Sequence, residues 1–254
     1  MLKDKVAIIT GGSYGIGRGI AKVFAMNGAD LILCARGEKR LEETADIIFA
    51  ATGKRPLISL CDVSKRGDVE KTAALAMKEF GRIDILVNNA GVQRYAPVLE
   101  MTDEMWNEHL AINTTGVFLF TQIAAREMAK VGKGKIVNIA SDSGCAPLPD
   151  NASAYCASKA AVISFTRNAA KELGPLGIYC NCICPGAIGD TAMMDYFIEY
   201  TKGEGVAHCI EGAALKRLGT PEEIGNAALF LASSMSDFIT GEKILVTGGD
   251  LMSQ

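Results

Sequence analysis

The 254-residue chain has little net charge and no concentrated basic segment. Its formal net charge at pH 7 is −3, and no Lys/Arg-rich run stands out along the sequence. Binding to nucleic acid or to an anionic membrane surface usually depends on such a basic patch. We therefore expect neither nucleic acid nor membrane among the partners of this protein.

Long apolar runs are also lacking. No apolar segment reaches the roughly 20 residues that a membrane-spanning helix needs. The first residues, "MLKDKVAIIT", do not show the basic stretch and apolar core of a secretory signal. We therefore expect a cytoplasmic protein.

Histidine is scarce, and no pattern typical of a metal site is present. His109 and His208 have no partners at metal-ligand spacing, and we expect both to be structural. Cysteine is plentiful at eight residues, and "YCNCICPG" places three cysteines on one face of a predicted strand. The paired spacing with histidines typical of zinc sites is missing. We expect no metal and interpret the cysteines as reduced thiols packed in the core.

Short apolar runs alternate with longer segments of helical periodicity. The runs are rich in Val, Ile and Leu without polar alternation, which is typical of strands covered on both faces. They span 5–10, 30–35, 56–61, 83–89, 135–140, 178–184 and 243–248, and the helical patterns between them span 16–27, 38–51, 65–80, 102–130, 153–173 and 221–232. This alternation predicts an α/β fold with a Rossmann-type, doubly wound parallel sheet of about seven strands and helices on both faces.

No linker or change of composition divides the chain, so we expect one domain over residues 1–254. Residues 188–215 interrupt the alternation between the sixth predicted strand and the last predicted helix. Loops after the carboxyl ends of strands build the ligand crevice in open α/β sheets. We interpret residues 188–215, called the lid segment below, as a substrate lid; a surface excursion or an oligomer contact is the alternative.

A glycine-rich turn, "TGGSYGIG" (Thr10–Gly17), joins the first predicted strand to the first helix. Glycines at such a turn let backbone N–H groups approach a pyrophosphate at the helix N-terminus. The spacing of Gly11, Gly15 and Gly17 differs from the G-x-G-x-x-G fingerprint. Because the turn lies in the first strand–helix unit, it still favours a dinucleotide-binding site.

The stretch "YCASK" places Tyr155 and Lys159 four residues apart on a predicted helix. Side chains at that spacing lie on the same helix face. A lysine ammonium beside a phenol lowers the pKa of the phenol, so the pair could exchange protons near neutral pH. An ordinary surface pair is the alternative.

Several motifs occur in order along nearly the whole chain: "TGGSYGIG", "NNAG" (Asn88–Gly91), "INTTG" with Asn113, "IAS" ending at Ser141, "YCASK" and "CPG" (Cys184–Gly186). Together they resemble the short-chain dehydrogenase/reductase family, in its single-domain subtype. The resemblance implies an NAD(P)-dependent oxidoreductase that interconverts a secondary alcohol and a ketone at a CH–OH group.

The resemblance also implies four catalytic residues. Tyr155 would exchange the proton with the substrate oxygen, and Lys159 would lower its pKa and bind the nicotinamide ribose. Ser141 would hydrogen-bond the substrate oxygen, and Asn113 would help hold a water linking Lys159 to solvent. The segment from Ser141 to Tyr155 is one residue longer than is common in the family, and Ser143 is the alternative serine.

The end of the second predicted strand bears on the choice of cofactor. NAD enzymes usually offer a carboxylate there to the adenosine ribose, but this chain has Ala35 followed by Arg36. Asp30 lies at the wrong end of the strand, and Lys39 and Arg40 add positive charge. A guanidinium matches a 2′-phosphate in charge and geometry. We expect NADP(H) to be preferred, with NAD(H) possible.

By resemblance, the cofactor-binding residues come from the glycine-rich turn, the ends of the strands and the active site. They are Gly11, Ser13, Tyr14, Gly15, Ile16, Gly17, Arg36, Asp62, Val63, Asn89, Gly91, Tyr155, Lys159, Pro185, Gly186, Ile188 and Thr191.

The lid segment carries several apolar side chains: Met193, Met194, Tyr196, Phe197 and Tyr200. These would suit a bulky apolar substrate such as a steroid-like ring ketone, or they could form the buried face of a lid helix. Tyr95 and Leu148, near the expected active-site loops, are also apolar, and we expect Trp106 in the core.

Other functions stay open from the sequence. A 3-oxoacyl-[acyl-carrier-protein] reductase would want a basic rim near the site, to which Arg126, Lys130, Lys133 and Lys171 could contribute. A polyol or gluconate-type dehydrogenase is a further alternative. A catalytically silent nucleotide sensor is disfavoured because the Tyr–Lys pair and the serine are kept. The C-terminal "ITGEKILVTGGDLMSQ" resembles the family's last strand and tail, which implies a homotetramer or a homodimer.

Overall fold

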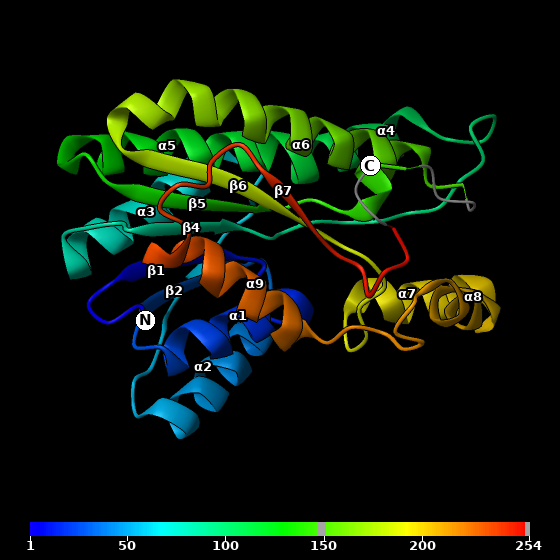
Figure 1. Cartoon of the computed structure of the whole chain (residues 1–254), viewed down its shortest axis with the longest axis horizontal. Coiled ribbons are helices and arrows are strands. Elements are labelled where there is room, and N and C mark those ends of the chain that lie inside the picture. Colours follow the sequence, from blue (N-terminus) through cyan, green and yellow to red (C-terminus); the bar gives the residue numbers. More distant parts are fainter. Residues whose placement is uncertain (147–150, 252–254) are drawn as a thin grey trace.

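The computed structural model describes residues 1–146 and 151–251 of the chain. Its centre is one seven-stranded sheet in the order β3-β2-β1-β4-β5-β6-β7, with every neighbouring pair of strands parallel (Figure 1). The strands are β1 (Val6–Thr10), β2 (Asp30–Ala35), β3 (Leu57–Leu60), β4 (Ile85–Asn88), β5 (Gly134–Ile139), β6 (Ile178–Pro185) and β7 (Lys243–Val246). The predicted Rossmann-type fold is confirmed.

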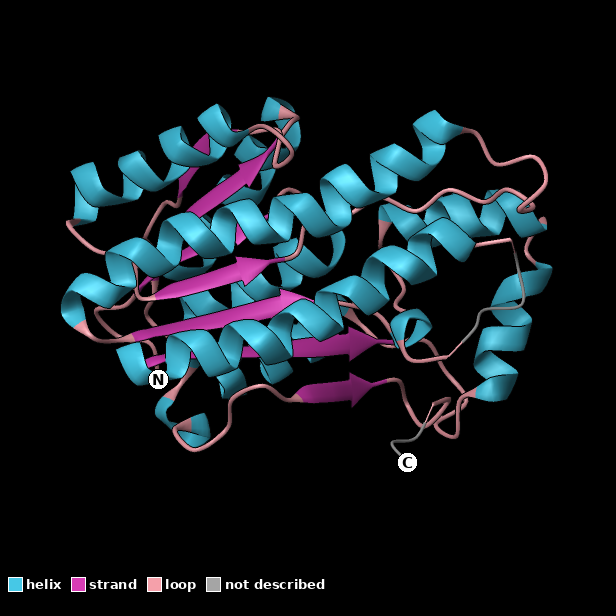
Figure 2. Cartoon of the chain, turned by 90° about the horizontal axis from the view of Figure 1, so that it is seen from above, coloured by secondary structure: helices cyan, strands magenta, loops and turns pink. Residues whose placement is uncertain are grey.

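Helices cover both faces of the sheet. One layer holds α1, α2 and α9, and the other holds α3, α5 and α6, as Figures 1 and 2 show from two sides. Their bounds are α1 (Gly15–Met26), α2 (Glu38–Thr52), α3 (Arg66–Phe80), α5 (Gly116–Val131), α6 (Ser153–Leu173) and α9 (Pro221–Ala232). Burial on both faces explains why the strand sequences lack polar alternation. The chain order reverses between β1 and β4, which is where such sheets form their ligand crevice.

The lid segment forms two helices, α7 (Ala192–Thr201) and α8 (Glu204–Gly212). Both lie beyond the carboxyl ends of the strands (Figure 1). The side chain of Thr191 starts α7 by accepting a hydrogen bond from Met194 N at 3.0 Å. The segment between β6 and α9 is therefore placed over the edge of the sheet where the crevice opens.

The single helix predicted over 102–130 is wrong. The structure has α4 (Asp103–His109), a π-helical segment (Leu110–Thr115) and then α5. The interruption coincides with Asn113, whose amide pairs with both backbone groups of Val92: Oδ1 accepts from N at 2.8 Å and Nδ2 donates to O at 2.9 Å. A π-helical segment commonly marks a functional site in a helix.

Two side chains on α4 have different surroundings. Trp106 is 40% exposed, so the prediction that it lies in the core is wrong: His109 is the buried residue of this short helix. The Nε2 of His109 accepts from Arg94 N at 3.0 Å, and its Nδ1 lies 2.7 Å from Met105 O. Both ring nitrogens are thus engaged, and the structural role predicted for His109 is confirmed.

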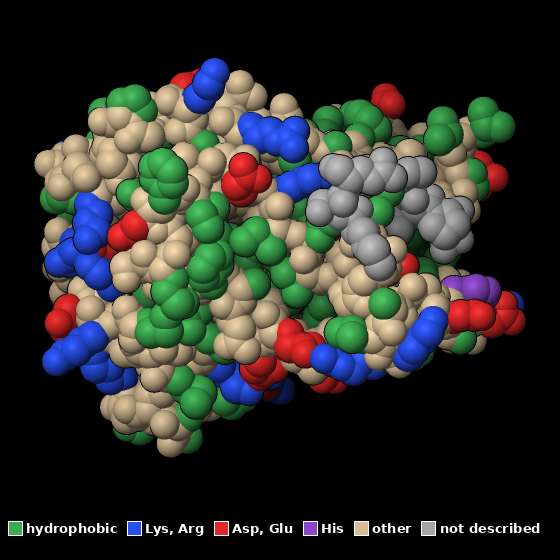
Figure 3. Space-filling model, in the orientation of Figure 1, with side chains coloured by type: hydrophobic (Ala, Val, Ile, Leu, Met, Phe, Trp, Pro, Cys, Tyr) green, Lys and Arg blue, Asp and Glu red, His purple; other side chains and the backbone are tan. Residues whose placement is uncertain are grey.

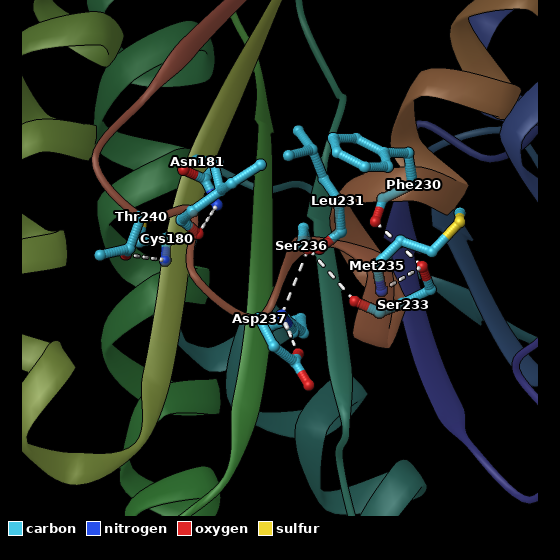
Figure 4. Close-up of polar contacts among 11 residues, drawn as sticks. Cys180, Asn181, Phe230, Leu231, Ser233, Met235, Ser236, Asp237 and Thr240 are labelled. Atoms are coloured by element: carbon cyan, nitrogen blue, oxygen red, sulfur yellow. Dashed lines mark hydrogen bonds and ion pairs between the residues drawn. The ribbon is translucent and has the colours of Figure 1, made fainter.

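Polar contacts tie the end of α9 and the loop before β7 to the sheet (Figure 4). Asn181 Nδ2 donates to Ile239 O at 2.9 Å, and Thr240 Oγ1 accepts from Cys180 N at 3.1 Å. The buried Lys135 ammonium lies 2.8 Å from Asp237 Oδ1. Buried backbone and charged groups at this edge of the sheet are therefore paired, as stability requires.

All eight cysteines are free thiols, and the prediction that they pack in the core is confirmed for the five buried ones: Cys34, Cys61, Cys180, Cys182 and Cys184. Cys145, Cys156 and Cys209 are partly exposed. Within residues 1–146 and 151–251, no group of three His, Cys, Asp or Glu side chains could hold a metal ion. In the same residues, no helix has the length and apolarity needed to cross a membrane. Cationic and anionic side chains are interspersed on the face in Figure 3.

Candidate active site

A cavity of about 880 Å³ opens at the carboxyl ends of the strands. Its walls come from the loops after β1 to β6 and from α6, α7 and α8, with Asp250 added from the segment after β7. All the predicted cofactor-binding residues except Gly17 line it: Gly11, Ser13, Tyr14, Gly15, Ile16, Arg36, Asp62, Val63, Asn89, Gly91, Tyr155, Lys159, Pro185, Gly186, Ile188 and Thr191. Residues far apart in sequence thus meet in one cavity at the switch point of the sheet.

The glycine-rich turn presents backbone to this cavity. Gly11 and Gly15 adopt φ of +64° and +56°, a conformation that other residues rarely take. The N-cap residue of α1, Tyr14, makes no side-chain capping bond, so the first N–H groups of the helix are left without a side-chain partner. Such N–H groups at a helix N-terminus favour an anion such as a phosphate.

Gly17 acts in packing instead of facing the cavity. A Cβ at this position would lie 2.1 Å from Gly11 O and 2.6 Å from Asn89 Nδ2. Asn89 Nδ2 in turn donates to Thr10 O at 2.9 Å, which joins the loop after β4 to the turn. The absent side chain therefore lets α1 start directly against the turn.

We predict that Gly17→Ala lowers cofactor affinity at least tenfold and destabilises the chain by roughly 1–3 kcal/mol, because the added methyl forces the backbone apart. Fluorescence titration with NADPH and urea denaturation would measure the two effects. Gly67→Ala in α3 is the control, since a Cβ there meets nothing within 4 Å. Unchanged affinity in the Gly17 variant would contradict the close approach of α1 to the turn.

Cationic side chains gather at the end of the cavity formed by β2 and α2. Arg36 and Arg40 line the cavity, whereas Lys39 does not. The guanidinium carbons of Arg18 and Arg40 lie 5.2 and 5.1 Å from the ring centroid of Tyr14. Ala35 offers no carboxylate here. Two guanidinium groups are therefore available where the adenosine ribose of a dinucleotide would lie.

Two aspartates differ in their distance from this cationic end. As predicted, Asp30 lies at the opposite end of β2, where it pairs with Lys54 at 3.0 Å. Asp62 lines the cavity. Hydrogen bonds from Ser64 hold the pKa of Asp62 below its usual value, with smaller contributions from the charges of Lys65 and Arg36.

Tyr155 and Lys159 lie on the cavity side of α6, and both are almost fully buried, with 6% and 3% exposure. Lys159 Nζ donates to Ile139 O at 2.9 Å and lies 5.6 Å from the centroid of the Tyr155 ring. The shared helix face predicted from their spacing is therefore present.

Burial reverses the expected effect on the tyrosine. It raises the pKa of Tyr155, and the hydrogen bond with Ser141 offsets this only in part. Burial also lowers the pKa of Lys159 to about 8 from the ordinary 10.5. The prediction of a lowered tyrosine pKa is wrong for the protein without cofactor, because removing both groups from water disfavours both charged forms. Tyr155 is thus held as a neutral phenol, which is a proton donor.

Ser141 follows β5 and is buried against the cavity. Its Oγ accepts from Ser143 N at 3.2 Å, lies 2.8 Å from Ser143 Oγ and donates to Asp142 Oδ1 at 3.0 Å. Both serines line the cavity, but Ser141 is the one whose side chain offsets part of the raised pKa of Tyr155. Ser141 therefore lies near the phenol, and its role as the catalytic serine stays a prediction.

Asn113 is buried behind the cavity and does not line it. Besides its two bonds to Val92, Nδ2 donates to Ser158 Oγ at 3.0 Å, so both of its N–H groups are used within the protein. The side chain therefore fixes the loop after β4 to α6. The water-holding role implied for Asn113 stays a prediction.

The sequence left two alternatives for the apolar side chains of the lid segment: they line the substrate pocket, or they form the buried face of a lid helix. The structure shows some of them at the cavity and others packed against the protein. Met193, Met194 and Phe197 line the cavity. Tyr196 and Tyr200 stack on Tyr95, with ring centroids 5.8 and 4.4 Å apart. Part of α7 thus forms the wall of the cavity and part packs on the loop after β4. Leu148 lies outside the described residues.

Several polar residues line the cavity that were not predicted from the sequence as site residues: Gln93, Asp142, His208, Cys209 and Asp250. Asp142 could have been found, because it directly follows Ser141. Asp250 could not, because only the fold brings the segment after β7 to this cavity. His208 lines the cavity and its Nδ1 lies 3.1 Å from Glu204 O, so the structural role expected for it stays a prediction.

The predicted basic rim does not form beside the cavity within one chain. Arg126 and Lys130 lie in the second half of α5, Lys133 lies directly before β5, and Lys171 lies in the last turn of α6 before β6. These positions are at the amino ends of the strands, whereas the cavity lies at their carboxyl ends. The expectation of a basic site entrance from these residues is wrong.

Comparisons with known proteins agree with this geometry. Residues 11–250 match the family described as "Enoyl-(Acyl carrier protein) reductase". The chain is 39% identical over 249 residues, 98% of each protein, to a 3-oxoacyl-[acyl-carrier-protein] reductase FabG of Chlamydia muridarum. It is 36% identical to an L-2,3-butanediol dehydrogenase of Corynebacterium glutamicum, over 98% of this chain and 99% of that protein.

A solved structure shares both the fold and the sequence pattern. The crystal structure of a short-chain type dehydrogenase/reductase from Mycobacterium marinum matches with a TM-score of 0.93 and 38% identity, over 98% of this chain and 96% of that one. We conclude that the chain belongs to the short-chain dehydrogenase/reductase family and is an NAD(P)-dependent oxidoreductase acting on CH–OH groups.

Proposed function

We propose that the protein interconverts a secondary alcohol and a ketone with NADP(H) as the preferred cofactor. The observation that carries this proposal is a single cavity that joins the glycine-rich turn and two arginines at one end to Ser141, Tyr155 and Lys159 at the other. One end suits a phosphorylated dinucleotide and the other suits proton transfer.

In the proposed reduction the bound cofactor supplies hydride to the carbonyl carbon. Tyr155 donates its phenolic proton to the carbonyl oxygen, which its neutral state in the buried site allows. Ser141 Oγ donates a hydrogen bond to the same oxygen once substrate displaces its bond to Asp142. Lys159, held by Ile139 O, orients the nicotinamide ribose and places positive charge near the tyrosine. Oxidation of the alcohol uses the same groups in reverse.

The arginines support the preference for NADP(H). A 2′-phosphate at the end of β2 would be exposed to Arg36 and Arg40, with no carboxylate at Ala35 to repel it. Guanidinium groups bind phosphate with charge-assisted, often bidentate, hydrogen bonds. An NAD-selective site would instead place a carboxylate there.

We predict that Arg36→Ala weakens NADPH binding roughly 10–100-fold, the loss expected for one or two charge-assisted hydrogen bonds. NADH binding should change less than threefold, because NADH lacks the 2′-phosphate. Calorimetric titration with each cofactor would measure both affinities. Lys39→Ala is the control, since Lys39 does not line the cavity. Equal losses for the two cofactors would contradict the assignment of a 2′-phosphate site.

The reaction itself is tested by following cofactor absorbance with NADPH or NADH against steroid ketones, acetoacetyl thioesters, keto-sugars and diketones. Turnover of one class would establish an alcohol–ketone oxidoreductase. Tight cofactor binding without turnover of any class would overturn the proposal. A 3-oxoacyl thioester is the second candidate substrate, favoured by the 39% identity to the Chlamydia muridarum reductase.

A further inference from the structure

The cavity has two halves: a cofactor half, lined by the glycine-rich turn and the two arginines, and a substrate half, lined by Ser141 and Tyr155. Their side chains differ in polarity and charge, and this difference indicates which substrates would fit. The methyl carbon of Met193 and Nζ of Lys159 lie 3.4 and 3.5 Å from where a Cβ of Gly91 would stand. Gly91 belongs to the proposed cofactor half, so this apolar side chain from the lid segment covers cofactor-binding backbone. An apolar lid therefore does not by itself indicate an apolar substrate.

Asp142 offers one carboxylate oxygen to the substrate half of the cavity. Its Oδ1 accepts hydrogen bonds from Ser143 N at 2.6 Å, Ser141 Oγ at 3.0 Å and Ser143 Oγ at 3.2 Å. Its Oδ2 has no hydrogen-bond partner among residues 1–146 and 151–251, and lies 3.3 Å from where a Cβ of Gly186 would stand. Both Asp142 and Gly186 line the cavity. One oxygen thus fixes the active-site turn while the other is available to a ligand.

Asp250 supplies a second carboxylate to the same half. Its Oδ1 lies 2.6 Å from where a Cβ of Gly212, at the end of α8, would stand. Its negative charge is close enough to raise the pKa of Asp142, which burial raises more strongly. His208, on α8, also lines the cavity, and its Nδ1 lies 3.1 Å from Glu204 O.

In the described part of the chain, the lysine or arginine that lines this half is Lys159, which donates to Ile139 O and forms no ion pair with either carboxylate. Neither Asp142 nor Asp250 forms an ion pair there, and the cavity-lining cations are Arg36, Arg40 and the buried Lys159. A carboxylate substrate would meet like charges at short range, which costs several kcal/mol. An apolar ring would cover Asp142 Oδ2 without giving it a hydrogen bond, leaving a costly unpaired polar atom.

From this arrangement we infer the substrate class: an uncharged polyhydroxylated alcohol or the matching hydroxyketone, whose hydroxyl groups beside the reacting carbon donate to Asp142 Oδ2 and Asp250. The inference rests on the proposed alcohol–ketone reaction and adds a pair of specificity-determining carboxylates to it. In the oxidation, Tyr155 would first release its phenolic proton and then accept the proton of the alcohol hydroxyl, while the alcohol carbon gives hydride to NADP⁺; the products are the ketone, NADPH and one released proton.

The test compares three compounds with one carbon skeleton: xylitol, xylonate and 1-amino-1-deoxyxylitol, which are neutral, anionic and cationic. We expect kcat/KM for xylitol to exceed that for xylonate at least tenfold with NADP⁺. Asp250→Asn should reduce this ratio at least threefold, mainly through KM, and Asp250→Glu should keep it. Asp195→Asn, an exposed α7 residue outside the cavity, is the matched control and should leave the ratio unchanged.

Calorimetric binding of the same three compounds to NADPH-loaded protein separates this inference from the proposed reaction. Binding of xylitol without turnover of any alcohol or ketone would overturn the reaction and support the substrate class. Equal or tighter binding of xylonate would overturn the substrate class, as would a preference for the amine or for a steroid ketone. Asp142→Asn, which keeps an acceptor for the turn, should shift the charge preference in the same direction as Asp250→Asn.

Discussion

Replacing Tyr155 with Phe is expected to lower turnover roughly 10²–10⁴-fold, the range contributed by a positioned proton donor. The hydroxyl lies near Ser141 and is the group proposed to protonate the substrate oxygen, whereas the ring packs with Tyr95 and Ala152. Phe keeps this packing and removes only the proton. NADPH affinity should therefore stay within about threefold, since the loss concerns chemistry more than binding.

Cofactor absorbance gives the turnover, and fluorescence titration gives the NADPH affinity. Ser141→Ala is a useful companion, because it removes the hydrogen bond proposed for the substrate oxygen while leaving the proposed proton donor, Tyr155, in place. Joint loss of NADPH binding and stability in Tyr155→Phe would point to a structural role for the hydroxyl. Retention of more than a tenth of the turnover would mean that another group supplies the proton.

The sheet could be predicted from the sequence because each strand carries its own signal. Runs such as 30–35 are apolar throughout, since both faces of a parallel strand are buried, and they lie between helix-ending glycines. The glycine-rich turn and the Tyr155–Lys159 pair are also local patterns. Most of the candidate cofactor site followed from these local features combined with the order of the motifs.

Features that depend on contacts between distant segments could not be predicted. The π-helical segment forms where Asn113 pairs with Val92, a residue 21 positions away. Asp250 reaches the cavity only because β7 ends at the same edge of the sheet as β5 and β6. The pKa of Tyr155 is governed by burial, which a helical spacing does not report. Local sequence patterns therefore could not predict the features that depend on long-range contacts or on burial.

Replacing Lys159 with Met is expected to abolish turnover while making the cofactor-free protein more stable at neutral pH. Lys159 is 3% exposed, and its burial lowers its pKa to about 8 from 10.5. Below pH 8 the folded chain must hold a buried ammonium, which the unfolded chain keeps in water. A difference of this size corresponds to about 3 kcal/mol, reduced by about 1 kcal/mol for the lost bond to Ile139 O.

The stability difference between the wild type and Lys159→Met should depend on pH. Between pH 8 and 10.5 the unfolded chain binds more protons at Lys159 than the folded chain, so the stability of the wild type rises with pH across this window. The advantage of Lys159→Met should therefore be full below pH 8 and vanish by about pH 10.5. Urea denaturation from pH 6 to 10.5 would measure it, with Lys54→Met, an exposed lysine, as the control. A variant less stable than the wild type at pH 7 would show that the buried ammonium stabilises the cofactor-free protein, which would contradict a burial cost at Lys159.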